Sequence, residues 1–226
     1  MTTHTDREYE ADLHLLRERL LLMGGIVEEM IRDALTAAIE RDAALAQAVI
    51  DRDREVNRAE VEIDRLCLKI LALRQPAASD LRFVTFALKA VTDVERIGDL
   101  AVNVAQRASE LSAEPPLPLP PAVARMAALV QTMLHQALDA FVRGDADAAG
   151  ALASRDDEVD ALYVEVFGRE LDAMRDPAVI QRALRQIFLA KNLERLGDHI
   201  QNLAEMVIFM AQGKDVRHPH SRDPEP

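Results

Sequence analysis

The sequence predicts an all-α fold of two similar three-helix bundles. The segment 95–99 reads Glu-Arg-Ile-Gly-Asp and returns at 194–198 as Glu-Arg-Leu-Gly-Asp, an offset of 99 residues. A self-match at this period indicates two copies of one unit, and 226 residues leave room for two small domains. Apolar residues make up 49% of the chain and aromatic residues only 4%, with no Trp. This composition suits packed helices better than sheets.

Three long helical patterns make up the first half of the chain. Apolar residues spaced three and four apart predict helices over 6–42, 43–74 and 79–112. Gly24 and Gly25 interrupt the first pattern, where we expect a kink or a close helix contact. Ser79 is expected to cap the third helix. Short connections between long helices predict antiparallel neighbours, and therefore an up-down-up bundle.

A proline-rich linker separates this bundle from a second one with the same plan. Helical patterns in the second half cover 122–143, 145–175 and 176–212. Gly144 and Gly213 are expected to end helices, and Asp145 and Asp176 to cap them. We therefore expect a first bundle, a stiff linker, a second bundle and a flexible tail at 1–112, 113–121, 122–213 and 214–226.

The charge and cysteine content exclude several classes of function. A formal net charge of -12 argues against nucleic-acid binding and against adhesion to anionic membranes. The single cysteine, Cys67, rules out an intramolecular disulfide and is expected in the core. The N-terminal segment lacks the apolar region of a signal peptide, and no apolar run is long enough to span a membrane. We therefore expect a cytoplasmic protein.

Two predicted helices carry matching rows of oxygen-bearing side chains at positions i, i+4 and i+8. The rows consist of Glu95, Asp99 and Asn103 in the third helix and of Glu194, Asp198 and Asn202 in the sixth. Such spacing places each row on one helix face, where like charges destabilise an isolated helix by about 0.2–0.5 kcal/mol. Gly98 and Gly197, directly before the aspartates, each cost about 1 kcal/mol more than Ala. A costly pattern that occurs twice indicates a compensating cation, a close helix or a partner.

The middle helix of each half adds further oxygen ligands. Asp53 and Asn57 align with Asp156 and Asp160 at an offset of 103 residues. If the middle and third helices face each other, each half holds a set of carboxylate and amide oxygens, which suit Mg, Mn, Ca or iron. Zn is a further candidate, because carboxylates also bind it. Asn57 stands where the second half has Asp160, so the first set is less acidic and is expected to bind a cation more weakly.

A plain helical bundle, with or without bound metal, remains an alternative. The acidic rows can be solvated faces in which Arg96 pairs with Asp99, and Arg195 with Asp198, at i, i+3. Surface ion pairs of this kind contribute little to stability.

A metal-dependent phosphohydrolase is the other alternative. Against it, the sequence shows no glycine-rich phosphate loop, Ser-His-Asp arrangement or cysteine cluster. No histidine follows a Glu at i+3, as di-iron bundles require. We expect His199 at the surface rather than among the ligands, and expect His218 and His220, in the tail, to bind metal weakly at most.

Taken together, these motifs resemble the PhoU family, regulators of bacterial phosphate uptake. The resemblance covers most of residues 8–218 and rests on five segments. They are the two acidic motifs, Met-Gly-Gly-Ile-Val-Glu at 23–28, Arg-Gln-Pro-Ala-Ala-Ser-Asp-Leu-Arg at 74–82, and the closing run at 213–218. The resemblance implies two three-helix bundles related by a pseudo-twofold and a non-enzymatic role.

The same resemblance implies specific partners and sites. It implies a negative regulator that acts between the ATPase subunit of the phosphate ABC transporter and the PAS domain of a sensor histidine kinase, and that forms a homodimer. It places metal at Glu95 with Asp99 and at Glu194 with Asp198, with the other oxygen-bearing residues named above as additional ligands. Arg96 and Arg195 become candidates for partner contacts, with salt bridges that orient the acidic rows as the alternative.

Overall fold

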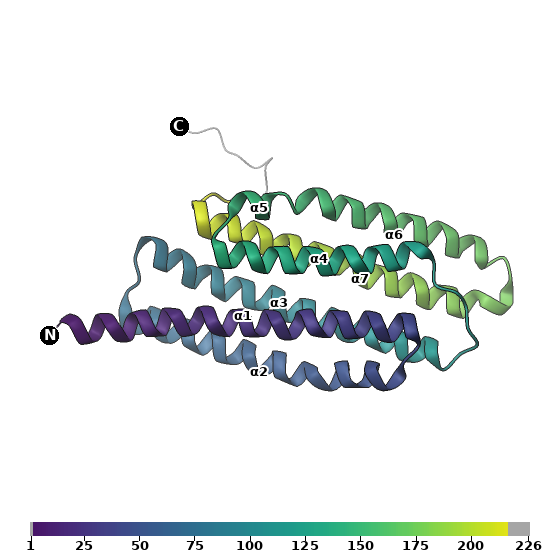
Figure 1. Cartoon of the computed structure of the whole chain (residues 1–226), viewed down its shortest axis with the longest axis horizontal. Coiled ribbons are helices and arrows are strands. Elements are labelled where there is room, and N and C mark those ends of the chain that lie inside the picture. The colour runs from purple at the N-terminus through teal and green to yellow at the C-terminus, as the bar shows by residue number, and fades with distance from the viewer. Residues whose placement is uncertain (1, 217–226) are drawn as a thin grey trace.

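The computed structural model describes residues 2–216, and within them the chain is entirely helical, without strands. It contains seven α-helices and one 3-10 helix: α1 (Thr2–Glu40), α2 (Ala43–Arg74), α3 (Ala78–Ser112), α4 (Pro121–Arg143), α5 (Ala146–Gly150), α6 (Ala153–Ala173), η1 (Pro177–Val179) and α7 (Ile180–Gln212). The first three form one bundle, and α4, α6 and α7 form a second, with α5 at its edge (Figure 1). The predicted all-α fold of two three-helix bundles is confirmed. None of the helices described has an apolar stretch that would cross a bilayer.

The helix ends agree with most of the predicted capping signals. Asp145 Oδ1 accepts hydrogen bonds from two backbone N–H groups at the start of α5, and Asp176 Oδ1 accepts one at the start of η1. Gly144 and Gly213 end α4 and α7 with φ of 63° and 70°, the left-handed conformation that glycine adopts without strain. The capping role expected of Ser79 is wrong, because α3 begins one residue earlier and Ala77 occupies the cap position without a side-chain bond.

The fifth predicted helix is not continuous. It breaks after Gly150, so that the short α5 precedes α6. Gly150 lowers the helix propensity at this point, and the turn allows Ala149 and Leu152 to be buried together, at 2% and 1% exposure. The tail predicted from 214 onward, with His218 and His220, lies mostly outside the described residues.

Gly24 in α1 lies against α4 of the other bundle. A Cβ atom on Gly24 would lie 2.7 Å from Leu138 Cδ2 of α4, closer than side chains pack. The expected close helix contact is therefore confirmed, and α1 continues as one helix through both glycines. A larger residue at this position would force the Leu138 side chain to move.

One apolar core extends through both bundles, because α3 and α7 pack against each other along their length. The Phe86 ring of α3 stacks on Phe141 of α4 with centroids 5.0 Å apart. At the surface of the same junction, His199 Nδ1 donates to Asp93 Oδ1 at 2.9 Å. Cys67 is fully buried, as expected. The surface position expected for His199 is correct only in part, because its side chain is 22% exposed and pairs with Asp93 of the other bundle.

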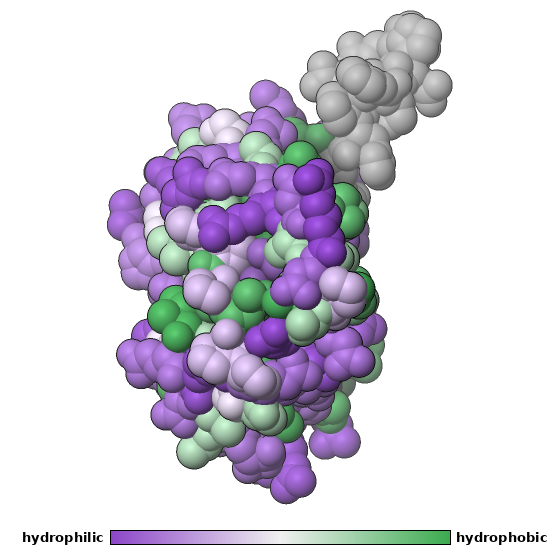
Figure 2. All heavy atoms as spheres, turned by 90° about the vertical axis from the view of Figure 1, so that its right-hand side faces the viewer, coloured by the Kyte–Doolittle hydropathy of each residue, from purple (hydrophilic) through white to green (hydrophobic). Residues whose placement is uncertain are grey.

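The linker packs against the molecule instead of spanning open solvent. Gln186 Nε2 of α7 donates to the Leu117 carbonyl oxygen at 3.0 Å, and Arg182 Nη1 donates to the Pro115 carbonyl oxygen at 3.2 Å. Figure 2 shows this end of the molecule, where hydrophobic residues gather in a band between the two bundles. A groove of about 330 Å³ lies beside the linker prolines there, between α1 and α4.

We predict that replacing Phe141 with Ala destabilises the whole molecule. Phe141 is 3% exposed and contacts rings from the other bundle, so its removal leaves a cavity in the shared core and costs about 3–5 kcal/mol. Chemical denaturation followed by circular dichroism measures this free energy of unfolding. Phe188→Ala is the control, because Phe188 is 55% exposed and surface substitutions change stability by about 0.5 kcal/mol or less. Equal effects of the two variants would contradict a shared core.

Candidate functional site

Two acidic clusters lie where α2 packs on α3 and where α6 packs on α7. The first cluster consists of Asp53, Asn57, Glu95 and Asp99, and the second of Asp156, Asp160, Glu194 and Asp198. Both helix pairs run antiparallel, so the residue rows predicted from the sequence face each other across each pair.

In the first cluster, partly buried carboxylates oppose one another. Burial raises the pKa of Asp53, and the charge of Asp99 adds to the rise, whereas the hydrogen bond that Asn57 Nδ2 donates at 2.8 Å lowers it. Burial also raises the pKa of Glu95, with Asp99 again contributing. Glu60 of α2 belongs to the same environment, since burial raises its pKa and Asp64 and Asp99 repel it. Sequence reasoning missed Glu60, although it lies one turn beyond Asn57 on the same helix.

The second cluster is more strongly perturbed. Burial raises the pKa of Asp156 from 3.8 to about 7, and the charges of Asp198 and Asp160 add to the rise. Burial raises the pKa of Asp198 as well, followed by repulsion from Glu194 and Asp160. The second cluster has Asp160 where the first has the neutral Asn57, and no amide hydrogen bond offsets the repulsion. The negative charge concentrated here favours a cation.

Several carboxylate oxygens in the clusters have no hydrogen-bond partner. The buried atoms Asp53 Oδ1, Asp156 Oδ1 and Glu194 Oε2 accept no hydrogen bond, and buried polar atoms are nearly always satisfied. Oxygen donors of this kind match the ligand preference of hard cations. Within residues 2–216, no group of three or more His, Cys, Asp or Glu side chains is already arranged as ligands of one ion. A bound cation would therefore draw in the carboxylates by side-chain rotation.

The glycine in each acidic motif permits the close helix approach. A Cβ atom on Gly197 would lie 2.6 Å from Asp156 Oδ1, and one on Gly98 would lie 3.2 Å from Val56 Cγ1. The expectation that something comes close to these glycines is confirmed, and the neighbour is the middle helix of the same bundle. Gly197 leaves space for Asp156, the carboxylate with the largest stated rise in pKa among the described residues. The acidic motif and the site therefore depend on each other.

The ion pairs between basic residues and carboxylates differ between the two clusters. Arg96 pairs with Asp99 at 3.0 Å and lies 3.6 Å from Glu95, as expected for a salt bridge that orients the acidic row. In the second cluster Lys191 pairs with Glu194 at 2.5 Å. The structure gives no ion pair between Arg195 and Asp198, so that part of the alternative fails, and Arg195 is exposed.

The two asparagines at the ends of the rows make no hydrogen bond to the clusters. Asn103 and Asn202 lie one turn beyond Asp99 and Asp198, and neither shares a hydrogen bond with a cluster carboxylate among the described residues. Their role as additional ligands stays a prediction.

Comparison with known proteins identifies the family. The PhoU domain matches twice, over residues 20–108 and 123–207. The phosphate-specific transport system accessory protein PhoU homolog of Pseudomonas aeruginosa is 45% identical over 221 residues, covering 96% of this chain and 91% of that protein. The accessory protein PhoU of Escherichia coli is 38% identical, with the same coverage. The chain belongs to the PhoU family.

Solved PhoU structures have the same fold. The crystal structure of PhoU from Pseudomonas aeruginosa superposes with a TM-score of 0.87 and 43% identity, covering 91% of this chain and all of that one. The structure of the phosphate transport system regulatory protein PhoU from Streptococcus pneumoniae gives a TM-score of 0.86 at 28% identity, covering 92% and 99% of the two chains. Each PhoU repeat of this chain contains one of the acidic clusters.

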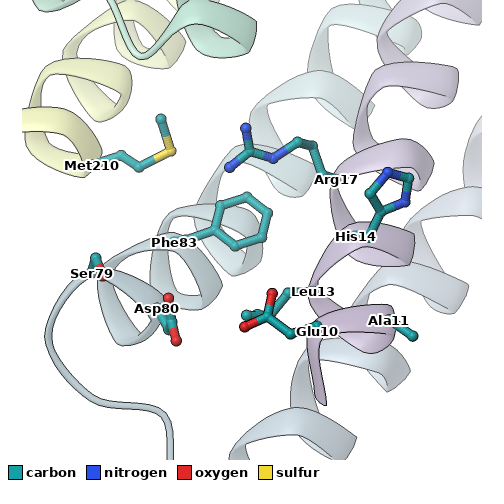
Figure 3. Close-up of a pocket in the computed structure, with 9 residues that line it drawn as sticks. All are labelled: Glu10, Ala11, Leu13, His14, Arg17, Ser79, Asp80, Phe83 and Met210. Atoms are coloured by element: carbon teal, nitrogen blue, oxygen red, sulfur yellow. The ribbon is translucent and has the colours of Figure 1, made fainter. Parts of the chain in front are cut away.

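A separate cavity of about 740 Å³ opens between α1, α3 and the end of α7 (Figure 3). The Arg17 guanidinium lies 5.1 Å from the centre of the Phe83 ring, and Glu10 and Asp80 line the same cavity. Tyr9 donates a hydrogen bond to Asp80 at 2.7 Å, and burial with this bond raises the Tyr9 pKa to about 12. Glu10 and Asp80 lie beside Arg17 and His14 in this lining, so the carboxylates offset the positive charge that an anion would need.

We predict that Asp156 makes the stability of the metal-free protein depend on pH. An aspartate with pKa about 7 when folded and 3.8 when unfolded binds more protons in the native state between these values. The free energy of unfolding therefore falls as the pH rises from about 4 to 7, by on the order of 2–4 kcal/mol. Urea unfolding in chelator at several pH values measures this change.

Asp156→Asn should remove most of that fall and raise the stability at pH 8 above wild type. Glu158→Gln is the matched control, because Glu158 is exposed on the same helix and is not among the charges that raise the pKa of Asp156, and it should retain the wild-type pH dependence. A wild-type protein whose stability stays constant between pH 4 and 7 would show that the Asp156 carboxylate is not perturbed.

Proposed function

We propose that this protein regulates phosphate uptake and phosphate-starvation signalling as a non-enzymatic adaptor. The observation that carries the proposal is the match of both halves to the PhoU domain, together with relatives named as accessory or regulatory proteins of phosphate transport. In this proposal the protein binds the ATPase subunit of the phosphate ABC transporter and the PAS domain of a sensor histidine kinase in the cytoplasm. It restrains the starvation response while phosphate is plentiful, and it acts as a homodimer.

The acidic clusters support a cation as part of this adaptor. Their carboxylates are partly buried, repel one another and include oxygens without partners. A divalent ion or iron would be held by Asp156, Asp160, Glu194 and Asp198 in the second cluster and, more weakly, by the residues of the first. When bound, the ion supplies positive charge that neutralises the carboxylates and fixes α6 against α7. Arg195 is exposed beside the second cluster and is available for partner contact.

We predict that Mn²⁺ or Mg²⁺ raises the thermal midpoint of chelator-treated protein. Ligand at 100 times its Kd stabilises the native state by about 2.7 kcal/mol, which corresponds to a shift of about 5–10 °C for a chain of this size. Asp156→Asn with Asp198→Asn should abolish most of the shift. The equivalent pair in the first cluster, Asp53→Asn with Asp99→Asn, should reduce it less. Equal shifts in the wild type and both double variants would place the ion elsewhere.

The adaptor role is tested by binding of purified partners. With phosphate in excess, isothermal titration with the transporter ATPase subunit and with the kinase PAS domain should give a Kd in the micromolar range or below. Arg195→Ala should weaken binding about tenfold, equivalent to about 1.4 kcal/mol. Arg54→Ala, at an exposed position on α2, serves as the control and should bind like wild type. If neither partner binds the wild-type protein, the adaptor role is incorrect.

A further inference from the structure

An exposed apolar surface covers the outer side of the α6–α7 pair, which forms the edge of the molecule opposite α2 (Figure 1). We call it the α6–α7 apolar face. It consists of Val164, Phe167 and Leu171 on α6 and Ile180, Leu184 and Phe188 on α7. Their exposed fractions range from 37% for Ile180 to 68% for Val164. Large exposed apolar surfaces are uncommon on monomeric proteins and mark interaction sites.

The six side chains lie on one continuous face. Val164, Phe167 and Leu171 follow the spacing of one helix stripe, as do Ile180, Leu184 and Phe188. A contact between Lys191 and Tyr163 shows which parts of α6 and α7 lie side by side, since Lys191 Nζ lies 5.2 Å from the centre of the Tyr163 ring. Tyr163 in turn contacts Phe167, with ring centroids 6.2 Å apart. Because α6 and α7 are antiparallel, the residues after Tyr163 lie beside the residues before Lys191.

The fold does not require apolar side chains at three positions of this face. The duplication aligns Phe167 with Asp64 and, on the third helix of each bundle, Leu184 with Thr85 and Phe188 with Lys89. At the other three positions the first bundle is apolar and exposed as well, because Val164, Leu171 and Ile180 align with Val61, Leu68 and Leu81. The second bundle thus enlarges an apolar surface that both bundles have in part, and its three additional apolar residues point to a role other than stabilising the helices.

The α6–α7 apolar face continues into the second acidic cluster. Asp160 lies seven residues before Phe167 on α6, which is about 10 Å along a helix. Asp198 lies on α7 ten residues after Phe188, about 15 Å away. A helix laid along this surface would contact apolar side chains over one part of its length and carboxylates about two to three turns away. The charge complement of the surface is therefore a helix whose apolar stripe is flanked at one end by Lys or Arg.

We propose that the α6–α7 apolar face binds an amphipathic helix of the transporter ATPase subunit, in which basic residues flank one end of an apolar stripe. This inference rests on the proposed function for the choice of partner, and on the surface itself for the chemistry.

The repeat supplies the variant that tests the proposal. Phe167→Asp, Leu184→Thr and Phe188→Lys together give the second bundle the residues of the first without changing the net charge. The matched control changes three exposed apolar residues of the first bundle in the same way, as Val61→Asp, Leu68→Thr and Leu81→Lys. Circular dichroism melts establish that both triple variants are folded, and Phe188→Lys alone replaces the first variant if it is not.

Affinity for the purified ATPase subunit is then measured by isothermal titration. We expect the second-bundle variant to lose at least about 30-fold in affinity, as for the removal of hot-spot aromatic residues, and the control to stay within about threefold. Binding of the PAS domain is measured in parallel and should be unchanged. Sedimentation of each variant reports self-association.

The outcomes separate the proposals. If wild type binds the ATPase subunit and the second-bundle variant binds equally well, the docking surface is incorrect and the adaptor role stands. If wild type is a dimer that this variant alone dissociates, the face joins two copies and the helix proposal is overturned. If the ATPase subunit does not bind wild type, the docking proposal is overturned, and PAS-domain binding decides whether any adaptor role remains.

Discussion

Mutual repulsion between partly buried carboxylates is the constraint on which the arrangement of this protein depends. Helix pairing in each bundle brings Asp53 towards Asp99 and Asp156 towards Asp198, and desolvation makes each charge more costly than in water. The apolar core that joins α3 to α7 must offset this cost. Gly197 lets the Asp156 carboxylate approach α7, whereas Gly98 lets the apolar Val56 approach α3. A fold that maintains this repulsion twice is poised to gain stability from a cation.

The two halves differ in how the negative charge of the acidic cluster is offset by neighbouring side chains. The first cluster is moderated by Asn57, which donates a hydrogen bond to Asp53, and by Arg96, which pairs with Asp99. The second cluster replaces the asparagine with Asp160 and leaves Arg195 without that ion pair. Divergence extends to the outer surface, where Asp64, Thr85 and Lys89 of the first bundle correspond to Phe167, Leu184 and Phe188 of the second. The second bundle therefore combines the more acidic cluster with the larger exposed apolar surface.

The sequence predicted the fold and the cluster residues because both depend on periodicity. Helical stripes gave the helix limits, with α2 correct at both ends. The shared offset of Asp53 with Asp156 gave the facing acidic rows. The periodicity did not predict the pairing of His199 with Asp93 or the packing of the linker under Gln186. These contacts depend on how the two bundles and the linker are placed relative to one another, and that placement leaves no periodic signal in the sequence. The break after Gly150 was missed since one glycine is compatible with an unbroken helix.

The proposed cation site and the proposed docking surface share the α6–α7 pair, so the two binding events would not be energetically independent. A cation at the second cluster would neutralise Asp160 and Asp198, the same carboxylates that attract the basic end of a partner helix. Occupied and empty clusters would therefore present different charge beside an unchanged apolar face. By thermodynamic linkage, a basic partner and a cation that compete for the same carboxylates weaken each other's binding by the same factor. In such an adaptor, the occupancy of the acidic cluster would set the affinity for the partner. The duplicated, less acidic first bundle would serve as structural support.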